Sequence, residues 1–197
     1  MCGIFGLIKY KESKISDNFL LDCINKLFLF SETRGSEAAG LAINTGKSIE
    51  ILKKAESPSQ FIKTKNYKRV FKNALNKYNN NSSNLSIIGH SRLVTNGHQS
   101  EDRNNQPIIV PGLAGIHNGI ITNHQRLFYD NDFRKDTEID TEIFLKILKD
   151  KIDNGNSLAI TLKEIYSQIK GTVSMAIFFE EYKNLLLTTN TGSLFYF

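Results

Sequence analysis

Residues 1–10 read MCGIFGLIKY, and they indicate both the first strand of the fold and a cysteine at its start. The apolar run from Ile4 to Ile8 predicts a short buried strand, and the polar residues from Lys9 to Lys14 predict a turn after it. No basic segment precedes the apolar run, and no small-residue cleavage site follows a long one, so a secretory signal peptide is not expected. The opening predicts a cytoplasmic protein with Cys2 at the start of its first strand.

The composition is that of an ordinary globular protein. The chain has 197 residues, of which 40% are hydrophobic and 23% charged, and these values exclude disordered, collagen-like and coiled-coil proteins. Every apolar run is far shorter than the roughly 20 residues that a membrane-spanning helix needs. We therefore expect one folded domain, or one domain and a fragment of another, without a membrane partner.

The formal net charge of +5 would suit an anionic partner. Lysines are frequent between Lys53 and Lys77, where Phe61, Phe71 and Tyr78 recur near helical spacing. An amphipathic helix explains both observations, since its lysines would form the face exposed to solvent. No nucleic-acid-binding motif accompanies the charge, so a nucleic-acid partner is not expected.

Two cysteines cannot build a disulfide framework, and they show no zinc-ligand spacing. Cys23 falls on the apolar stripe of a helix that is expected to begin near Asp17, an N-cap candidate. We expect Cys23 to face the core as a small hydrophobic residue. Cys2 is then either a second buried thiol or a reactive group.

Strands and helices are expected in separate runs along the chain. The pattern predicts strands at 41–44, 49–53, 85–93, 172–179 and 185–189, and helices at 141–153 and 157–169. Such runs indicate the α+β class rather than a regular alternation of strand and helix.

Loss of Met1 would give Cys2 a thiol and a free α-amine on the same carbon. An α-amine titrates at about 7.7 to 8.0 and a thiol at about 8.5 in model compounds, so near neutral pH the amine can take the proton from sulfur. One residue would then supply both nucleophile and base.

The segment His117-Asn118-Gly119 has two interpretations. Asn-Gly between apolar residues is a strong hairpin indicator, because both positions tolerate positive φ. Alternatively, the Asn118 side-chain amide and the Gly119 backbone N–H donate to the oxyanion that forms when a thiolate attacks a carboxamide. Taken alone, the dipeptide favours the hairpin.

Two charged segments also have a structural and a functional interpretation. Arg92 ends a β-like run within GHSRLVTNG, residues 89–97, and would hold a carboxylate by two parallel hydrogen bonds or form a surface ion pair. The acidic residues of 138–142 would complement a helix dipole, or one of them would hold a substrate ammonium group.

The order of these segments is more specific than any one of them. The chain has Cys2, then RGSEAAG at 34–40, GHSRLVTNG at 89–97, NQP at 105–107, HNGII at 117–121 and IDTE at 139–142. This order resembles the class II glutamine amidotransferases, which are N-terminal-nucleophile hydrolases, from residue 2 to about residue 192. The resemblance implies a four-layer αββα sandwich with two sheets between helical layers, and it implies neither a cofactor nor a metal.

The resemblance also implies a role for individual residues. Cys2 attacks the side-chain amide carbon of glutamine with its own α-amine as base, and water then hydrolyses the thioester to glutamate. Asn118 and Gly119 match the oxyanion hole. Arg92 matches the residue that grips the α-carboxylate of glutamine, and Asp140 matches the one that holds its α-ammonium.

Three further positions match the family less directly. Thr95 and Gly97 match residues that line the same pocket. Arg34 matches an arginine of a loop near the nucleophile.

The chain also departs from the family. Leu93 stands where an amino-sugar-forming subfamily has tryptophan, so coupling to an acceptor site is expected to differ. The family domain adds strands after the pair expected at 172–189, so residues 1–197 are expected to be a glutaminase domain lacking its last strands. No acceptor domain is recognised, and ammonia is expected to pass to a synthase partner, such as one that makes an amino sugar. The alternative is a catalytically silent module that binds glutamine.

Overall fold

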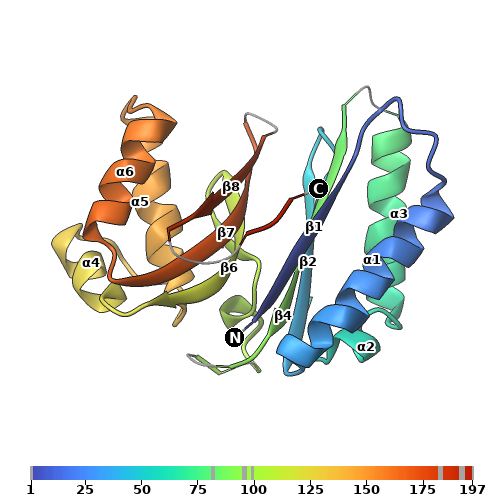
Figure 1. The fold of residues 1–197 in the computed structure, drawn as a ribbon, viewed down its shortest axis with the longest axis horizontal. Helices are drawn as coiled ribbons and strands as arrows, with labels where there is room; N and C mark the ends of the chain where they lie inside the picture. Colours follow the sequence, from blue (N-terminus) through green and yellow to red (C-terminus); the bar gives the residue numbers. More distant parts are fainter. Residues whose placement is uncertain are drawn as a thin grey trace.

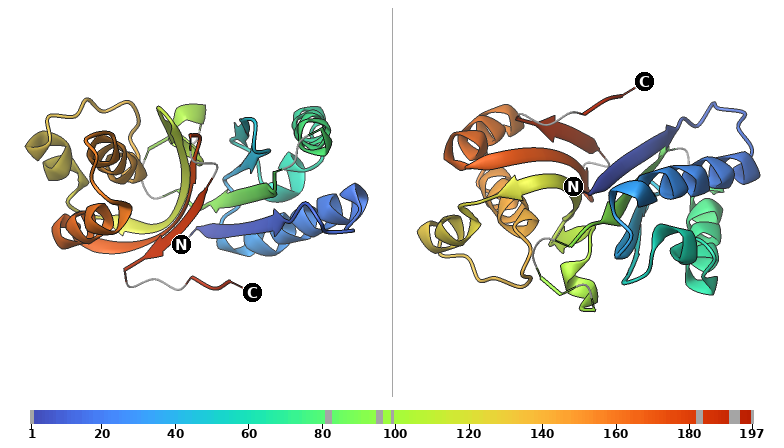
Figure 2. Two further views of the ribbon diagram at one scale, coloured as in Figure 1. Left: turned by 90° about the horizontal axis from the view of Figure 1, so that it is seen from above. Right: turned by 60° about the horizontal axis from the view of Figure 1, so that its bottom comes forward.

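The structure of the protein is a computed structural model that describes residues 2–80, 83–94, 97–98, 100–181, 184–190 and 194–196. Two four-stranded antiparallel sheets face each other, and each carries helices on its outer side (Figure 1). Figure 2 shows the same four layers from two further directions. The expected α+β sandwich with the layer order αββα is confirmed.

The first sheet, sheet A, has the strand order β1-β4-β2-β3. In that order its strands span Gly3–Lys9, Leu85–Arg92, Ala38–Asn44 and Ile49–Lys54. Three helices cover its outer face, namely α1 (Asp17–Ser31), α2 (Pro58–Phe61) and α3 (Lys65–Asn79). A short 3₁₀ helix, η1 (Glu32–Arg34), follows α1.

The second sheet, sheet B, has the strand order β5-β6-β7-β8. Its strands span Ile108–Val110, Leu113–Ile121, Gly171–Phe179 and Leu185–Thr189. Its outer helices are α4 (His124–Asp130), α5 (Thr141–Asp153) and α6 (Leu158–Gln168). The 3₁₀ helix η2 (Asp102–Asn104) lies in the connection between the sheets.

The core follows from the alternation of side chains along the strands. Leu41 and Ile43 of β2 pack toward the helices of sheet A, whereas Ala42 between them packs toward sheet B. Ile116 of β6 and Phe178 of β7 meet Ala42 in the layer between the sheets. A third cluster joins sheet B to its own helices. Both faces of each sheet are therefore buried, which accounts for the apolar runs in the sequence.

Most local expectations are confirmed, and the first helix needs two corrections. Its N-cap is Ser16 rather than Asp17, because Ser16 Oγ accepts the N–H of Phe19 at 3.2 Å. Cys23 is only half-buried, because the buried stripe is narrower than expected and consists of Leu20, Ile24 and Phe28.

The lysine-rich stretch is not one helix. Thr64 begins α3 by accepting the N–H of Tyr67 at 3.1 Å, so α2 and α3 are separate. The lysines of α3 are exposed and its aromatic residues are buried, as expected. Lys53 is the exception, because it belongs to β3 and its ammonium group lies against backbone carbonyls.

Within the described part of the chain, no helix has the length and apolar character needed to cross a membrane.

Candidate active site

Cys2 lies immediately before β1, and the marked N-terminus of the chain is at one end of the space between the sheets (Figure 1). Among the described residues, the only hydrogen-bond partner of its Sγ atom is the carbonyl oxygen of Leu93, at 3.5 Å. Burial raises the pKa of the Cys2 thiol, and the nearby Arg92 guanidinium opposes this only in part. The thiol is therefore protonated at neutral pH and needs a base to become a nucleophile.

Asn118 and Gly119 lie inside strand β6, where they pair with Ser174 and Val173 of β7. The strand continues to Ile121, so the hairpin interpretation is excluded. The Oδ1 atom of Asn118 is buried and has no hydrogen-bond partner among the described residues. An amide side chain without internal partners is available to a ligand.

Gly119 must be glycine for a steric reason. Its φ is +148°, and a Cβ atom on it would lie 2.0 Å from the carbonyl oxygen of Thr172. The two strands therefore approach each other more closely here than any side chain would allow.

Arg92 ends β4, and its guanidinium is held inside the protein. Only 4% of the residue is exposed, with Nη1 donating to Asn105 Oδ1 at 2.6 Å and Nη2 donating to the Gly97 carbonyl at 2.8 Å. Burial lowers the pKa of Arg92, whereas the carboxylates of Glu37 and Glu138 favour its charged form. Arg92 is thus a buried cation with a fixed orientation.

Asp140 lies directly before α5 and is buried beside β6. Its Oδ2 accepts the backbone N–H of Ile121 at 2.6 Å, and its Oδ1 lies 3.9 Å from His117 Nδ1. Asp140 and Arg92 act on the Cys2 thiol pKa in opposite directions. The fold thus brings Cys2, a cation and an anion to one end of the sandwich.

The other three residues expected at the site are Gly97, Thr95 and Arg34. Gly97 contributes its carbonyl to Arg92, whereas Thr95 lies outside the described residues. Arg34 is exposed at the end of η1 and lines an open hollow of about 300 Å³ together with Gly35, Ser36 and Leu93. Because the Leu93 carbonyl also accepts the hydrogen bond from Cys2, this hollow lies next to Cys2.

Gln106 is a buried residue to which the sequence assigned no role. Its Oε1 accepts the backbone N–H of His117, and its Nε2 donates to the carbonyl of the same residue at 3.2 Å. The His117 ring is held in turn by Thr141 Oγ1, 3.1 Å from Nδ1. Both the backbone and the side chain of the residue before Asn118 are therefore fixed.

Two buried histidines lie in this region, and neither is suited to acid catalysis. Burial lowers the pKa of His90 to about 3, and the neighbouring His117 and Arg92 add to the shift. Burial also lowers the pKa of His117, against the effect of Asp140. Both rings are therefore uncharged at neutral pH.

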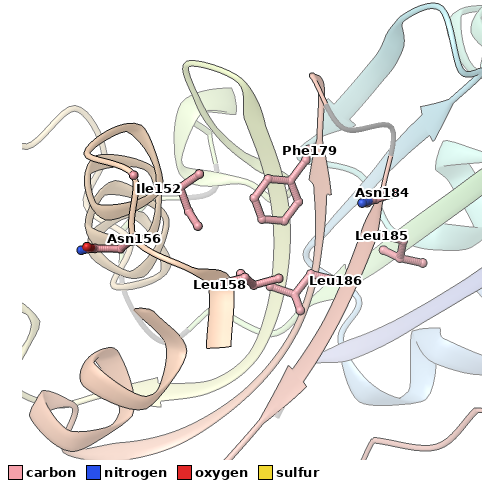
Figure 3. Close-up of a pocket in the computed structure, with 8 residues that line it drawn as sticks. Ile152, Asn156, Leu158, Phe179, Asn184, Leu185 and Leu186 are labelled. Atoms are coloured by element: carbon pink, nitrogen blue, oxygen red, sulfur yellow. The ribbon is translucent and has the colours of Figure 1, made fainter. Parts of the chain in front are cut away.

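A larger hollow lies away from this site, between β7, β8 and the α5–α6 connection (Figure 3). It measures about 530 Å³ and is lined mainly by apolar side chains, including Ile152, Leu158, Phe179 and Leu186. Among the described residues, its polar lining side chains are the amides of Asn156 and Asn184, and none of them is a nucleophile or an ionisable group. In the described part of the chain, no cluster of three or more His, Cys, Asp or Glu residues could hold a metal ion.

Gly40 of β2 provides a stability test of this arrangement. A Cβ atom on Gly40 would lie 1.8 Å from the carbonyl oxygen of Gln106, so the 105–107 segment packs directly on the strand backbone. We expect Gly40→Ala to lower the free energy of unfolding by about 3 kcal/mol, because the segment must move. Denaturant unfolding measures this, with Gly155→Ala as control, since a Cβ there has no neighbour within 4 Å and meets only an unfavourable φ. Equal losses in the two variants would contradict the close packing.

Residues 90–197 match the family described as a glutamine amidotransferase domain. Two curated relatives are glutamine–fructose-6-phosphate aminotransferases (isomerizing), from Bartonella henselae with 26% identity and from Brucella suis with 30% identity. Each alignment covers 98% of this chain but 29% of the relative, so the chain spans less than a third of their length.

Two solved structures share the fold. One is the glutamine phosphoribosylpyrophosphate amidotransferase from B. subtilis complexed with ADP and GMP, with a TM-score of 0.63 and 22% identity, covering 95% of this chain and 37% of that chain. The other is described as the allosteric regulatory enzyme of purine biosynthesis, with a TM-score of 0.63 and 20% identity, covering 90% of this chain and 35% of that one.

Proposed function

Because the chain belongs to the glutamine amidotransferase domain family, we propose that it hydrolyses L-glutamine to glutamate and ammonia through a thioester on Cys2. The observation that carries the proposal is the position of Cys2 at the end of the sandwich, where the Arg92 cation lowers and the Asp140 carboxylate raises the pKa of its thiol. This arrangement offers a nucleophile beside one positive and one negative group, which suits an amino acid substrate.

The reaction begins with removal of Met1, which frees the α-amine of Cys2. The neutral amine takes the proton from Sγ, and the sulfur attacks the side-chain amide carbon of glutamine. The tetrahedral oxyanion collapses as the amine returns the proton to the leaving nitrogen, which departs as ammonia. Water, deprotonated by the same amine, then hydrolyses the thioester to glutamate and restores the thiol.

The surroundings of the sulfur support the amine as base. Burial keeps the Cys2 thiol protonated, and its hydrogen-bond partner among the described residues is a carbonyl, which cannot take a proton. The α-amine is attached to the same carbon and titrates at about 7.7 to 8.0 in model compounds, close to the working pH.

Asn118 and Gly119 are the proposed oxyanion hole. Within the described part of the chain the Asn118 Oδ1 atom has no hydrogen-bond partner, so no bond to this atom prevents the amide from turning its N–H groups toward a ligand. Gln106 fixes the backbone of the preceding residue, His117, and thereby limits how far the strand can move. Donors that are already in place stabilise a developing charge without reorganisation.

Arg92 and Asp140 are proposed to hold the two charged groups at the amino acid end of glutamine. We expect Arg92→Ala to raise the KM for glutamine by about 10- to 100-fold, because a charge-assisted contact to the carboxylate is lost. Steady-state kinetics measures this, with Arg126→Ala as control, since Arg126 is an exposed helix residue paired with Asp130. An unchanged KM would remove Arg92 from the substrate site.

We further propose that residues 1–197 form a glutaminase domain whose ammonia passes to a synthase domain or subunit in the cytoplasm. Support comes from the relatives, which are more than three times as long as the matched region and are named as aminotransferases acting on fructose 6-phosphate. Amino-sugar synthesis is the proposed use of the ammonia.

The proposal is tested by incubating the purified protein with glutamine and measuring glutamate and ammonia. Stoichiometric release of both products is expected. Glutamine binding in calorimetry without release of either product would instead indicate the silent glutamine-binding module.

A further inference from the structure

Lys53 is a lysine of sheet A whose side chain is directed at backbone atoms rather than at solvent. Its Nζ atom donates to the carbonyl oxygens of Asn105 at 2.8 Å, Pro107 at 3.0 Å and Arg103 at 3.4 Å. An ammonium group has three N–H donors and no acceptor, so all three are used on one short segment. Hydrogen bonds from a charged donor are stronger than neutral ones.

Strand β2, which pairs with β3 beside Lys53, also contacts the 103–107 segment. Lys53 of β3 is the direct cross-strand partner of Gly40 of β2. Gly40 leaves room for the backbone of Gln106, and Lys53 holds the carbonyls on either side of it. The sheet thus provides both the space and the attachment for the 103–107 segment.

The same segment supports both parts of the proposed site. Asn105 accepts a hydrogen bond from the guanidinium of Arg92. Gln106 binds both backbone groups of His117, the residue before Asn118. A displacement of the segment would therefore alter the carboxylate-binding cation and the oxyanion strand together.

We propose that Lys53 is a positioning residue of the glutamine site, because it fixes the 103–107 segment that orients Arg92 through Asn105 and His117 through Gln106. This inference rests on the proposed function for the identity of the substrate. Lys53 acts through the segment, since its polar contacts go to backbone carbonyls.

The test variant is Lys53→Met, which keeps the length and apolar stem of the side chain but has no donor. Its neighbour supplies a matched control, because Lys54 is half-buried like Lys53, and its ion pair among the described residues is the 3.8 Å contact with Asp102. We expect Lys53→Met to weaken glutamine binding about tenfold and to lower kcat about tenfold, while Lys54→Met changes each by less than about twofold.

Hydrogen exchange tests the positioning independently of glutamine. In Lys53→Met, peptides covering 103–107 and 116–120 are expected to exchange faster than in the parent protein, with α1 unchanged as an internal reference. Unchanged exchange in both peptides would overturn the inference, even if the protein hydrolyses glutamine.

A double-mutant cycle with Asn105→Ala shows whether the effect passes through the segment. Glutamine dissociation constants are measured by calorimetry in a Cys2→Ala background, where no turnover occurs. In the Asn105→Ala variant the contact from Asn105 to Arg92 is already lost. We therefore expect the further change Lys53→Met to raise the dissociation constant for glutamine by less than about twofold. Fully additive effects would overturn the proposed route to Arg92. If the parent protein neither binds nor hydrolyses glutamine, the proposed function fails, and the exchange experiment still decides whether Lys53 fixes the segment.

Discussion

Replacing Cys2 with alanine is expected to abolish glutamine hydrolysis, with a loss of at least about 10⁴-fold in kcat. The sulfur forms the thioester in the proposed reaction, and the Arg92 and Asp140 charges both act on the pKa of its thiol. Glutamate release by the purified variant measures the loss.

The second cysteine provides the matched control for this variant. Cys23 is half-buried on α1, on the outer side of sheet A. Cys23→Ala removes the same atom type and is expected to keep the parent activity. Loss of activity in Cys23→Ala alone, or substantial hydrolysis by Cys2→Ala, would contradict the assignment of the nucleophile.

The expected pH dependence of glutamine hydrolysis by the parent protein follows from the same assignment. The α-amine must be uncharged to accept the thiol proton, so kcat/KM is expected to rise with pH up to about 8. Above that pH the rise should end, because burial lowers the pKa of Lys53 to about 8 and the ammonium group that holds the 103–107 segment is lost. Below the pKa of the amine, each pH unit should lower kcat/KM about tenfold. Burial raises the pKa of the Cys2 thiol, so free thiolate does not replace the amine at low pH.

Asn118→Ala is expected to lower kcat by about 10²- to 10³-fold with little change in KM. Removal of one donor from a preorganised oxyanion hole costs roughly 2.7 to 4 kcal/mol in the transition state. The ground-state carboxamide carries less charge than the oxyanion, so substrate binding depends less on this donor.

Steady-state kinetics with Asn76→Ala as control measures the Asn118 effect. Asn76 is an exposed residue of α3, on the opposite side of sheet A from β6. An unchanged kcat in Asn118→Ala would leave Asn118 as an ordinary residue of β6. A large rise in KM with unchanged kcat would instead place it among the substrate-binding groups.

The local elements could be predicted because their apolar spacing is regular. The helix expected at 141–153 has those bounds in the structure, and the strands expected at 49–53 and 185–189 differ by at most one residue. The pairing order β1-β4-β2-β3 could not be predicted in this way, because it joins residues that are far apart along the chain.

The candidate site could also be predicted only in part, because some of its contacts join residues far apart along the chain. The motif order brought Cys2, Arg92 and Asp140 into consideration, whereas the Asn-Gly dipeptide alone favoured a hairpin that does not form. The sequence predicts an exposed Lys53, because the carbonyls of residues 103, 105 and 107 that bind it lie about fifty residues later. A side chain that binds backbone atoms far along the chain gives no periodic pattern in the sequence from which the contact could be predicted.

The most direct test of the account is the intact mass of the protein after incubation with a diazo-ketone analogue of glutamine, which alkylates a thiol with loss of nitrogen gas. We expect the parent protein to lack Met1 and to carry one adduct, and the Cys2→Ala variant to carry none. An adduct that persists in Cys2→Ala, or a parent protein that retains Met1 and still hydrolyses glutamine, would contradict this expectation.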